Sequence, residues 1–314
     1  MLRYIARRII SLLIILWLVS FLTFFLLQVI PGDPAQLILG IEASPEALDS
    51  LRARLGLDRP WPLRYLHWLA GMLRGDMGVS IRLERPVSSL IVERLPVTVS
   101  LAVMAMLIAL TLAFPAGILS AVKWNSPFDY FVLFASQIGI AIPSFWIGIL
   151  LILAFSFYLR ILPTGGFVSW GKNPFEALRH LILPATSLGL VTAAFLTRML
   201  RSSMLEVLSQ AYITTARAKG LARFQVIFRH AIKNALIPVA TLAGVQIGFL
   251  MGGSIVIEQV FALPGLGRLL LSAVYTRDIP LIQGLVMFMT TMVVASNLLV
   301  DILYAYLDPR IRFE

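Results

Sequence analysis

The sequence contains no cysteine, and this absence excludes disulfide bonds and thiolate chemistry. Charged residues make up only 13% of the chain, whereas a soluble domain contains about 25%. The three histidines, His67, His180 and His230, are scattered, and no His-Glu-x-x-His pair or carboxylate cluster has metal-site spacing. The Gly-x-x-x-x-Gly-Lys-Ser/Thr phosphate loop and the Gly-x-Ser-x-Gly nucleophile motif are also missing. We therefore expect no catalytic residue, no metal and no cofactor on this chain.

Long apolar runs fill most of the chain instead. Hydrophobic residues account for 59% of the sequence, and the mean hydropathy is +0.89. A run of about 20 apolar residues is long enough to cross a bilayer as a helix. Six such segments can be drawn, at residues 9–30, 98–122, 130–159, 181–200, 236–257 and 281–304. The predicted fold class is an all-α polytopic membrane protein with six transmembrane helices, the third tilted, kinked or shortened at Pro143.

The net charge of +10 could indicate nucleic acid, but its distribution between the apolar segments favours a topological role. Segments 1–8, 123–129, 198–235 and 305–314 hold thirteen Lys and Arg against four acidic residues, whereas residues 31–97 carry eight of each sign. Because cationic loops remain in the cytoplasm, we expect those four segments and both termini to be cytoplasmic, in the plasma (inner) membrane. Membrane lipid is an expected partner, and nucleic acid is not.

These patterns divide the chain into four parts. Residues 1–30 are expected to be a retained first transmembrane helix, because the apolar run exceeds that of a signal peptide and no cleavage site follows. Residues 31–97 are expected to form an extracytoplasmic helical subdomain. Residues 98–306 would be the transmembrane core, with a cytoplasmic loop at 201–235, and residues 307–314 a cytoplasmic tail.

The extracytoplasmic subdomain contains two helical patterns. Ser44 and Pro45 are the residue types of an N-cap and a first helical position, and leucines follow at helical spacing. A second stretch, rich in Trp and Tyr, starts near Trp61 and breaks between Gly71 and Gly78. We interpret its aromatic residues as interfacial anchors and core, with ligand contact as the alternative.

Glycine recurs every fourth residue in the fifth apolar segment, at Gly244, Gly248 and Gly252, and the polar Gln246 lies near this stripe. Small residues on one helical face allow another helix to approach closely. We therefore expect helix packing along the stripe, and lining of a substrate path is the alternative interpretation.

A Pro-Gly turn follows this segment. It is combined with a short amphipathic pattern, so we expect an element at the outer membrane edge that lies on the surface or re-enters the membrane. The residues assigned to this extracytoplasmic gate element are Glu258, Pro264, Gly265, Gly267, Arg277 and Asp278.

The cytoplasmic loop 201–235 is too charged to lie within a bilayer, yet it has helical periodicity. Two adjoining apolar stripes are present, Leu221 with Phe224 and Phe228, and Ile227 with Ala231 and Ala235. We expect this apolar face to pack on the membrane bundle while the cations remain accessible below. Gly220 is expected to turn the chain between two short helices, because glycine tolerates positive φ.

This loop resembles the coupling loop of ATP-binding-cassette importer permeases, specifically those of the dipeptide, oligopeptide and nickel family. In the pattern Glu-Ala-Ala-x-x-x-Gly, the matching positions are Thr214, Thr215, Ala216 and Gly220. The Leu-Pro that usually ends the pattern comes later in this sequence, at Leu236-Ile-Pro238. Replacement of the Glu and the first Ala is what the peptide/nickel subgroup looks like. The resemblance assigns ATPase coupling to Thr214, Thr215, Ala216, Arg217, Ala218, Lys219, Gly220, Leu221 and Arg223.

The resemblance extends over nearly the full chain. Further family-like pieces are Pro31-Gly32-Asp33-Pro34, Leu55-Gly56-Leu57-Asp58, Ile142-Pro143-Ser144-Phe145-Trp146, Gly252-Gly253-Ser254 and Leu307-Asp308-Pro309-Arg310. Each piece alone is weak, but together and in order they are specific. They imply a type I importer transmembrane domain of six helices with cytoplasmic coupling helices.

The resemblance also implies partners. These would be a homologous second permease, two cytoplasmic ATPase subunits that hold the ATP and Mg, and an extracytoplasmic solute-binding protein. Small peptides are the expected cargo, and nickel chelates or glutathione are the alternatives within the same architecture. A membrane enzyme or an ATP-independent channel is the rival class, which the missing catalytic and filter motifs disfavour.

Overall fold

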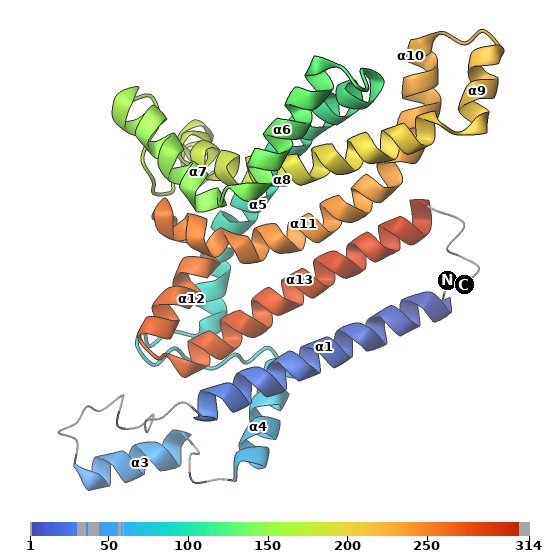
Figure 1. Ribbon diagram of the computed structural model, residues 1–314. Helices are drawn as coiled ribbons and strands as arrows, with labels where there is room; N and C mark the ends of the chain where they lie inside the picture. Colours follow the sequence, from blue (N-terminus) through green and yellow to red (C-terminus); the bar gives the residue numbers. More distant parts are fainter. Residues whose placement is uncertain (1, 30–35, 37–43, 56–57, 59, 308–314) are drawn as a thin grey trace. The chain divides into compact units, whose positions relative to one another are not determined.

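The computed structural model describes residues 2–29, 36, 44–55, 58 and 60–307, and helices dominate this part of the chain (Figure 1). The elements are α1 (Leu2–Val29), α3 (Pro45–Leu55), α4 (Trp61–Leu73), α5 (Val87–Val122), α6 (Pro127–Ala141), α7 (Ser144–Leu151), η1 (Ile152–Tyr158), α8 (Pro174–Leu208), α9 (Ala211–Ala218), α10 (Arg223–Gln225), η2 (Val226–Ala231), α11 (Ile232–Val260), α12 (Leu266–Tyr275) and α13 (Ile279–Leu307). Both η elements are π-helices. Over the described residues, the expected all-α fold is confirmed.

Five helices are long and apolar enough to cross a membrane, over Arg7–Leu26, Val87–Val122, Pro174–Leu208, Arg223–Gly252 and Ile279–Val300. The segment expected at 130–159 is a pair of helices, Pro127–Ala141 and Ser144–Tyr158, bent by 100°. Pro143 lies at the break, and Ile142 before it has the extended backbone that a following proline imposes. The expected kink at Pro143 is confirmed. If the bent pair is one span, the described residues contain six.

Two spans are longer than the apolar segments that marked them. Helix α5 begins at Val87, well before the expected start at 98, and α8 begins at Pro174 rather than near 181. The reason at α8 is a local helix-start signal that hydropathy does not detect. The Asn173 side chain accepts hydrogen bonds from the backbone N–H groups of Phe175 and Glu176, at 3.1 and 3.2 Å. Pro174 follows at the first helical position, which suits its fixed φ.

Some expected features fall outside the described residues. They are the Pro-Gly-Asp-Pro turn at 31–34, the helix end at Gly56, the surroundings of Gly253 and the tail beyond Leu307.

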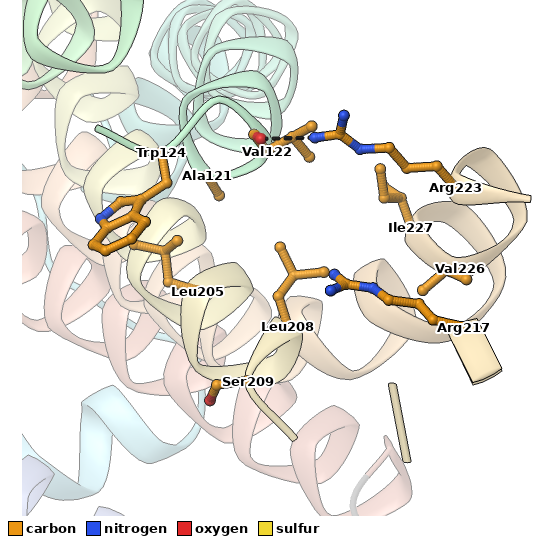
Figure 2. Close-up of a pocket in the computed structure, with 10 residues that line it drawn as sticks. All are labelled: Ala121, Val122, Trp124, Leu205, Leu208, Ser209, Arg217, Arg223, Val226 and Ile227. Atoms are coloured by element: carbon orange, nitrogen blue, oxygen red, sulfur yellow. Dashed lines mark hydrogen bonds between the residues drawn. The ribbon is translucent and has the colours of Figure 1, made fainter. Parts of the chain in front are cut away.

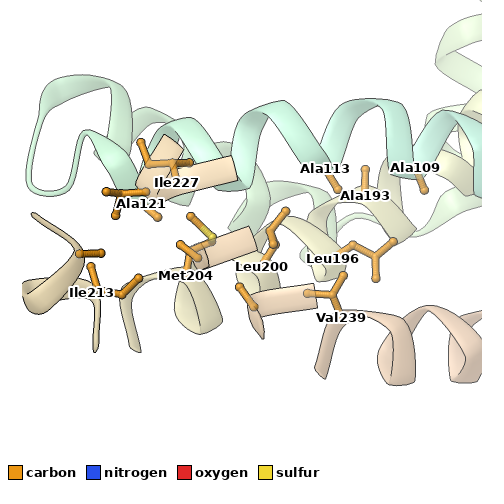
Figure 3. Close-up of a cluster of buried hydrophobic side chains, with 14 residues drawn as sticks. Ala109, Ala113, Ala121, Ala193, Leu196, Leu200, Met204, Ile213, Ile227 and Val239 are labelled. Carbon is orange, nitrogen blue, oxygen red and sulfur yellow. The ribbon is translucent and has the colours of Figure 1, made fainter. Parts of the chain in front are cut away.

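The chain divides into two compact units. The larger unit comprises Met1–Ala6, Pro96–Arg268 and Met292–Glu314. One of its hydrophobic clusters is built from α5, α8, α9, η2 and α11 (Figure 3). Alanines of α5, such as Ala109 and Ala113, belong to this cluster together with Leu196 and Leu200 of α8. Small side chains on one helix and large ones on its neighbour allow close packing in a membrane protein.

The smaller unit comprises Arg7–Leu95 and Leu269–Thr291. Here α1 and α4 meet through aromatic side chains. The Tyr65 hydroxyl lies 2.8 Å from the Ser20 hydroxyl, and the Phe24 ring lies 5.4 Å from Tyr65 and 5.6 Å from Trp68. Tyr65 is therefore core, as interpreted from the sequence. Helix α3 begins at Pro45, and the Ser44 hydroxyl accepts a hydrogen bond from the Ala47 N–H at 3.3 Å, which confirms the expected N-cap.

Candidate functional site

A short helix–turn–helix, residues 211–225, follows α8 and joins it to η2 (Figure 1). Helix α9 ends just before Gly220, which has a φ of +79°. The Leu221 N–H donates to the Ala216 carbonyl at 3.4 Å, and the Gly220 N–H donates to the Arg217 carbonyl at 2.9 Å. These two bonds form a Schellman motif, which requires the left-handed conformation that glycine adopts readily. The turn expected at Gly220 is present.

The inner face of the helix–turn–helix is fixed to the larger unit. Ile213 and Ala216 of α9 are buried in the cluster of Figure 3. The Asn234 side chain of α11 donates a hydrogen bond to the Tyr212 hydroxyl at 2.8 Å. Because α9 is anchored through both apolar and polar contacts, its orientation relative to α8 and α11 is set by the bundle.

The outer face of the same element is open. Of the nine residues assigned to coupling from the sequence, Ala216 is buried and the other eight are exposed. The exposed residues are Thr214, Thr215, Arg217, Ala218, Lys219, Gly220, Leu221 and Arg223. All eight are therefore accessible, and two of them, Arg217 and Arg223, lie on the side that faces α5 and α8, where they line a cavity.

One expectation about this region is wrong. Leu221, Phe224 and Phe228 do not pack on the bundle, since their exposed fractions are 38%, 67% and 53%. The two phenylalanine rings stack on each other, with centroids 4.2 Å apart. The second stripe is buried and consists of Ile227, Ala231 and Ala235. Both stripes are apolar and adjoin each other, so the pattern alone does not show which of them the bundle buries.

A buried ion pair lies in the same unit, and the sequence patterns did not identify it. The carboxylate of Asp129 on α6 accepts two hydrogen bonds from the Arg201 guanidinium of α8, at 2.6 and 2.7 Å. It also accepts one from the Ser120 hydroxyl and one from the Asn125 N–H, at 3.0 Å for the latter. The Asp129 side chain is only 1% exposed. The pair joins the ends of α5, α6 and α8, and its only sequence signal is an acid in a cationic segment.

A cavity of about 480 Å³ lies between the ends of α5 and α8 and the helix–turn–helix (Figure 2). Its lining consists of Ala121, Val122, Trp124, Leu205, Leu208, Ser209, Arg217, Arg223, Val226 and Ile227. The Arg223 guanidinium donates to the Val122 carbonyl at 2.9 Å. This bond ties the helix–turn–helix to the last turn of α5.

The glycine stripe of α11 meets α13 over part of its length. A Cβ at Gly244 would lie 2.0 Å from Val300, and one at Gly248 would lie 3.3 Å from Val293. Gly252 has no atom within 4 Å of that position. The expected helix contact along the stripe is therefore absent at Gly252, because the contact with α13 covers only part of the α11 face. Gln246 is buried, with 8% of its surface exposed.

The Pro-Gly turn after α11 is held by a buried carboxylate. Glu258 accepts hydrogen bonds from the Thr98 hydroxyl at 2.7 Å and from the Arg268 N–H at 2.9 Å. Gly265 and Gly267 are buried here, and a Cβ at Gly265 would lie 2.3 Å from the Glu258 carboxyl carbon. Pro264, half-buried, precedes them. The structure thus brings four of the six assigned gate residues together.

Arg277 and Asp278 belong to the smaller unit and have different contacts. The buried Asp278 carboxylate accepts a hydrogen bond from the Ser80 hydroxyl at 2.5 Å and from the Ile81 and Arg82 N–H groups, at 3.2 and 3.3 Å. Asp278 therefore fixes the loop before α5. Arg277 is exposed and has a φ of +52°.

Apolar helices of spanning length, together with an anchored basic helix–turn–helix beyond the end of α8, define a multi-pass membrane protein. Comparison with known proteins identifies its family. The chain belongs to the family described as "Binding-protein-dependent transport system inner membrane component", whose model matches residues 113–313. The N-terminal model of the same transport system matches residues 1–102. The chain is thus a permease subunit of an ATP-binding-cassette importer and not an enzyme.

Two relatives cover almost the whole chain. The oligopeptide transport system permease protein AppB of Bacillus subtilis is 43% identical over 313 residues, and the alignment spans 99% of both chains. The dipeptide transport system permease protein DppB of Escherichia coli K12 is 42% identical, and the alignment spans 94% of both chains. Among solved structures, the inward-facing MetNI methionine transporter matches with a TM-score of 0.58 at 17% identity, covering 70% of this chain and 96% of that one. This last likeness supports the type I importer fold.

Proposed function

We propose that this chain forms half of a translocation pathway for small peptides and pairs with a homologous second permease. The cargo is inferred from the relatives named for peptide transport, which align over nearly the full length of both chains. A solute-binding protein would deliver the peptide from outside, as the family description of binding-protein-dependent transport implies. In this arrangement the Glu258 turn belongs to the extracytoplasmic gate, and the glycine stripe of α11 supports the pathway by helix packing.

The helix–turn–helix 211–225 would couple this pathway to two ATPase subunits that bind the ATP and Mg. The observation that carries this proposal is the contrast between its two faces: the inner face is anchored at Ile213 and Ala216, whereas the outer face is exposed. A push on the outer face would therefore be transmitted to α8 and α11 rather than absorbed by a loose loop. Movement between two arrangements of packed helices is a common means of alternating access.

The orientation follows from the charge distribution. The helix–turn–helix and both termini would be cytoplasmic, and residues 31–97 extracytoplasmic. Because the chain contains no cysteine, single cysteines can be introduced without a background. With an impermeant maleimide on intact spheroplasts, Ser50→Cys should react and Ala218→Cys should react only after lysis. Both positions are exposed. The reverse labelling pattern would contradict the orientation.

Cross-linking tests the coupling role. Ala218→Cys lies on the exposed face of α9, and in the assembled transporter a short cross-linker from it should capture an ATPase subunit. Ser50→Cys, in the subdomain on the other side of the membrane, is the matched control and should not. Capture of the binding protein from Ala218→Cys, or of nothing but lipid, would refute the coupling proposal.

A further inference from the structure

Helix α8 connects the helix–turn–helix with the rest of the larger unit (Figure 1). It ends at Leu208, and α9 begins at Ala211, so a displacement of α9 is transmitted directly to α8. The exposed bond from Arg223 to the Val122 carbonyl contacts only the end of α5. Helix α6 is joined to α8 in sequence through the long segment that contains α7 and η1. Whether α6 follows a movement of α8 therefore depends on the side-chain contacts between these two helices.

Two contacts between α6 and α8 bring the helices together without fixing their register. A Cβ at Gly139 would lie 3.0 Å from the Cβ of Ala194. Small residues allow helices to approach closely, but an apolar contact has no direction and permits sliding. The exposed Arg198 side chain donates a hydrogen bond to the Gln137 amide oxygen at 3.0 Å. A single exposed hydrogen bond exchanges readily with water, so it is a weak restraint.

The ion pair of Asp129 and Arg201 is the contact that fixes this register. The Arg201 guanidinium donates two hydrogen bonds to the carboxylate, at 2.6 and 2.7 Å, and a bidentate pair constrains the orientation of both groups. The same carboxylate accepts a hydrogen bond from the Ser120 hydroxyl, in the last turn of α5, and from the N–H of Asn125, in the turn between α5 and α6. Donors from α5, from this turn and from α8 thus converge on one side chain of α6.

Stability alone does not account for a charged pair at this position. The Asp129 and Arg201 side chains are 1% and 16% exposed. The free energy needed to remove two charges from water offsets much of their attraction, and an apolar pair of similar volume is often equally stable. An apolar pair lacks the directional bonds of the ion pair, however. What the ion pair adds is therefore a fixed geometry between α5, α6 and α8.

We propose that Asp129 and Arg201 are positioning residues for coupling, which make α6 and the end of α5 move with α8 when the ATPase subunits displace the helix–turn–helix. This inference rests on the coupling role proposed above. Helix α6 leads through the bend at Pro143 into α7, so the pair would also transmit the displacement to this bent segment. Without the pair, α8 would move and α6 would not follow it, and ATP would be hydrolysed without the complete change between the two arrangements of the pathway.

A distance measurement tests whether the pair fixes α6. Spin labels at Phe134→Cys on α6 and Ala218→Cys on α9, both exposed positions, report the separation of the two helices by pulsed electron spin resonance. The full chain would be purified with a cysteine-free form of its partner permease. With the ion pair intact, the distance distribution should be narrow. In the Arg201→Met/Asp129→Leu variant it should broaden, even though this variant should retain most of the melting temperature.

Transport measures the functional consequence. In proteoliposomes with the ATPase subunits and the binding protein, uptake of a radiolabelled tripeptide per ATP hydrolysed should fall about fivefold in the same double variant, which is the lower end of typical coupling between distant sites. A purely structural pair would return this ratio to normal together with the melting temperature. Arg201→Lys serves if the double variant folds poorly, because lysine keeps the charge but lacks the fork-shaped donor group. Its ratio should also fall.

Arg198→Met is the matched control, since it removes an exposed bond between the same two helices. It should change neither the distance distribution nor the ratio. A narrow distribution or a normal ratio in the stable double variant, a normal ratio in Arg201→Lys, or equal changes in the Arg198 control would overturn the proposal. Absence of uptake by the unmodified chain would instead refute the proposed cargo, and a missing Ala218→Cys cross-link the coupling role. The distance measurement is independent of both.

Discussion

Two glycine turns of the larger unit use glycine for opposite physical reasons. At Gly220 the backbone has a φ of +79°, and nothing lies within 4 Å of the position that a Cβ would take. At Gly265 a Cβ would lie 2.3–2.4 Å from the carboxylate atoms of Glu258. The first turn needs the backbone freedom of glycine, and the second needs the absence of a side chain.

The difference explains what each turn can do. The Gly265 turn has its partner inside the chain, because Glu258 already accepts hydrogen bonds from Thr98 and Arg268. The Gly220 turn has its inner face anchored and its outer face exposed. We infer that the Gly265 turn is a fixed internal contact and that the Gly220 turn is where another protein can bind.

The largest effect is expected from the ion pair between α6 and α8. It tests whether this pair stabilises the helices that precede the Gly220 turn. Arg201→Met would leave the buried Asp129 carboxylate without its guanidinium partner. Removal of one partner of a buried pair costs about 3–5 kcal/mol. Thermal unfolding in detergent should show a marked loss of stability.

The double variant Arg201→Met/Asp129→Leu is the control. It removes both charges, so it should recover most of the lost stability, since an apolar pair of similar volume can replace a buried ion pair. If Arg201→Met were as stable as the unmodified chain, the ion pair would not stabilise the contact between α6 and α8.

The next largest effect is expected at the Gly265 turn. Gly265→Ala would force the Glu258 carboxylate out of position, and overpacking of this kind costs about 1–3 kcal/mol. Gly252→Ala, which meets no atom within 4 Å, should be close to neutral. The combination Gly265→Ala/Glu258→Asp shortens the obstructing side chain and should restore part of the stability. Equal melting temperatures for Gly265→Ala and Gly252→Ala would contradict the close contact.

A smaller effect is expected at the Gly220 turn, where conformation rather than space is limiting. Left-handed backbone costs an ordinary residue about 1–2 kcal/mol, and a β-branched residue resists it most. Gly220→Val should therefore reduce ATP-driven transport more than Gly220→Ala, while Gly220→Asn should be tolerated best. Membrane insertion should be unchanged in all three. Normal transport by Gly220→Val would show that the turn is not required for coupling.

The sequence was informative where one local rule decides the structure. Apolar run length located the spans, Pro143 marked the bend, and Gly220 marked the turn, because each depends on residues close together in the chain. The Ser44 N-cap was predictable for the same reason. These features give the fold class and the position of the helix–turn–helix.

Other features depend on residues that only the fold brings together. Asp129 meets Arg201 across 72 positions of sequence, and Glu258 meets Thr98 across 160. Local periodicity does not predict pairs of residues so far apart in the sequence. The exposed Phe224 and Phe228 were misassigned because two apolar stripes adjoin in this segment and the bundle buries only the one with Ile227. Contacts between residues far apart in the sequence therefore limited what the sequence alone could predict about the site.

The smallest effect on stability is expected from Phe224→Ala. The Phe224 side chain is 67% exposed, and substitutions at exposed positions usually change stability by less than about 0.5 kcal/mol. Phe224 stacks on Phe228, and both rings remain more than half exposed in the described chain. If that surface binds an ATPase subunit, Phe224→Ala should leave the melting temperature of the permease unchanged and weaken ATPase binding. Phe175→Ala at the other end of the larger unit has the same exposed fraction, 67%, and should change neither quantity. Equal ATPase binding by both variants would show that the open face of the Gly220 turn ends before Phe224.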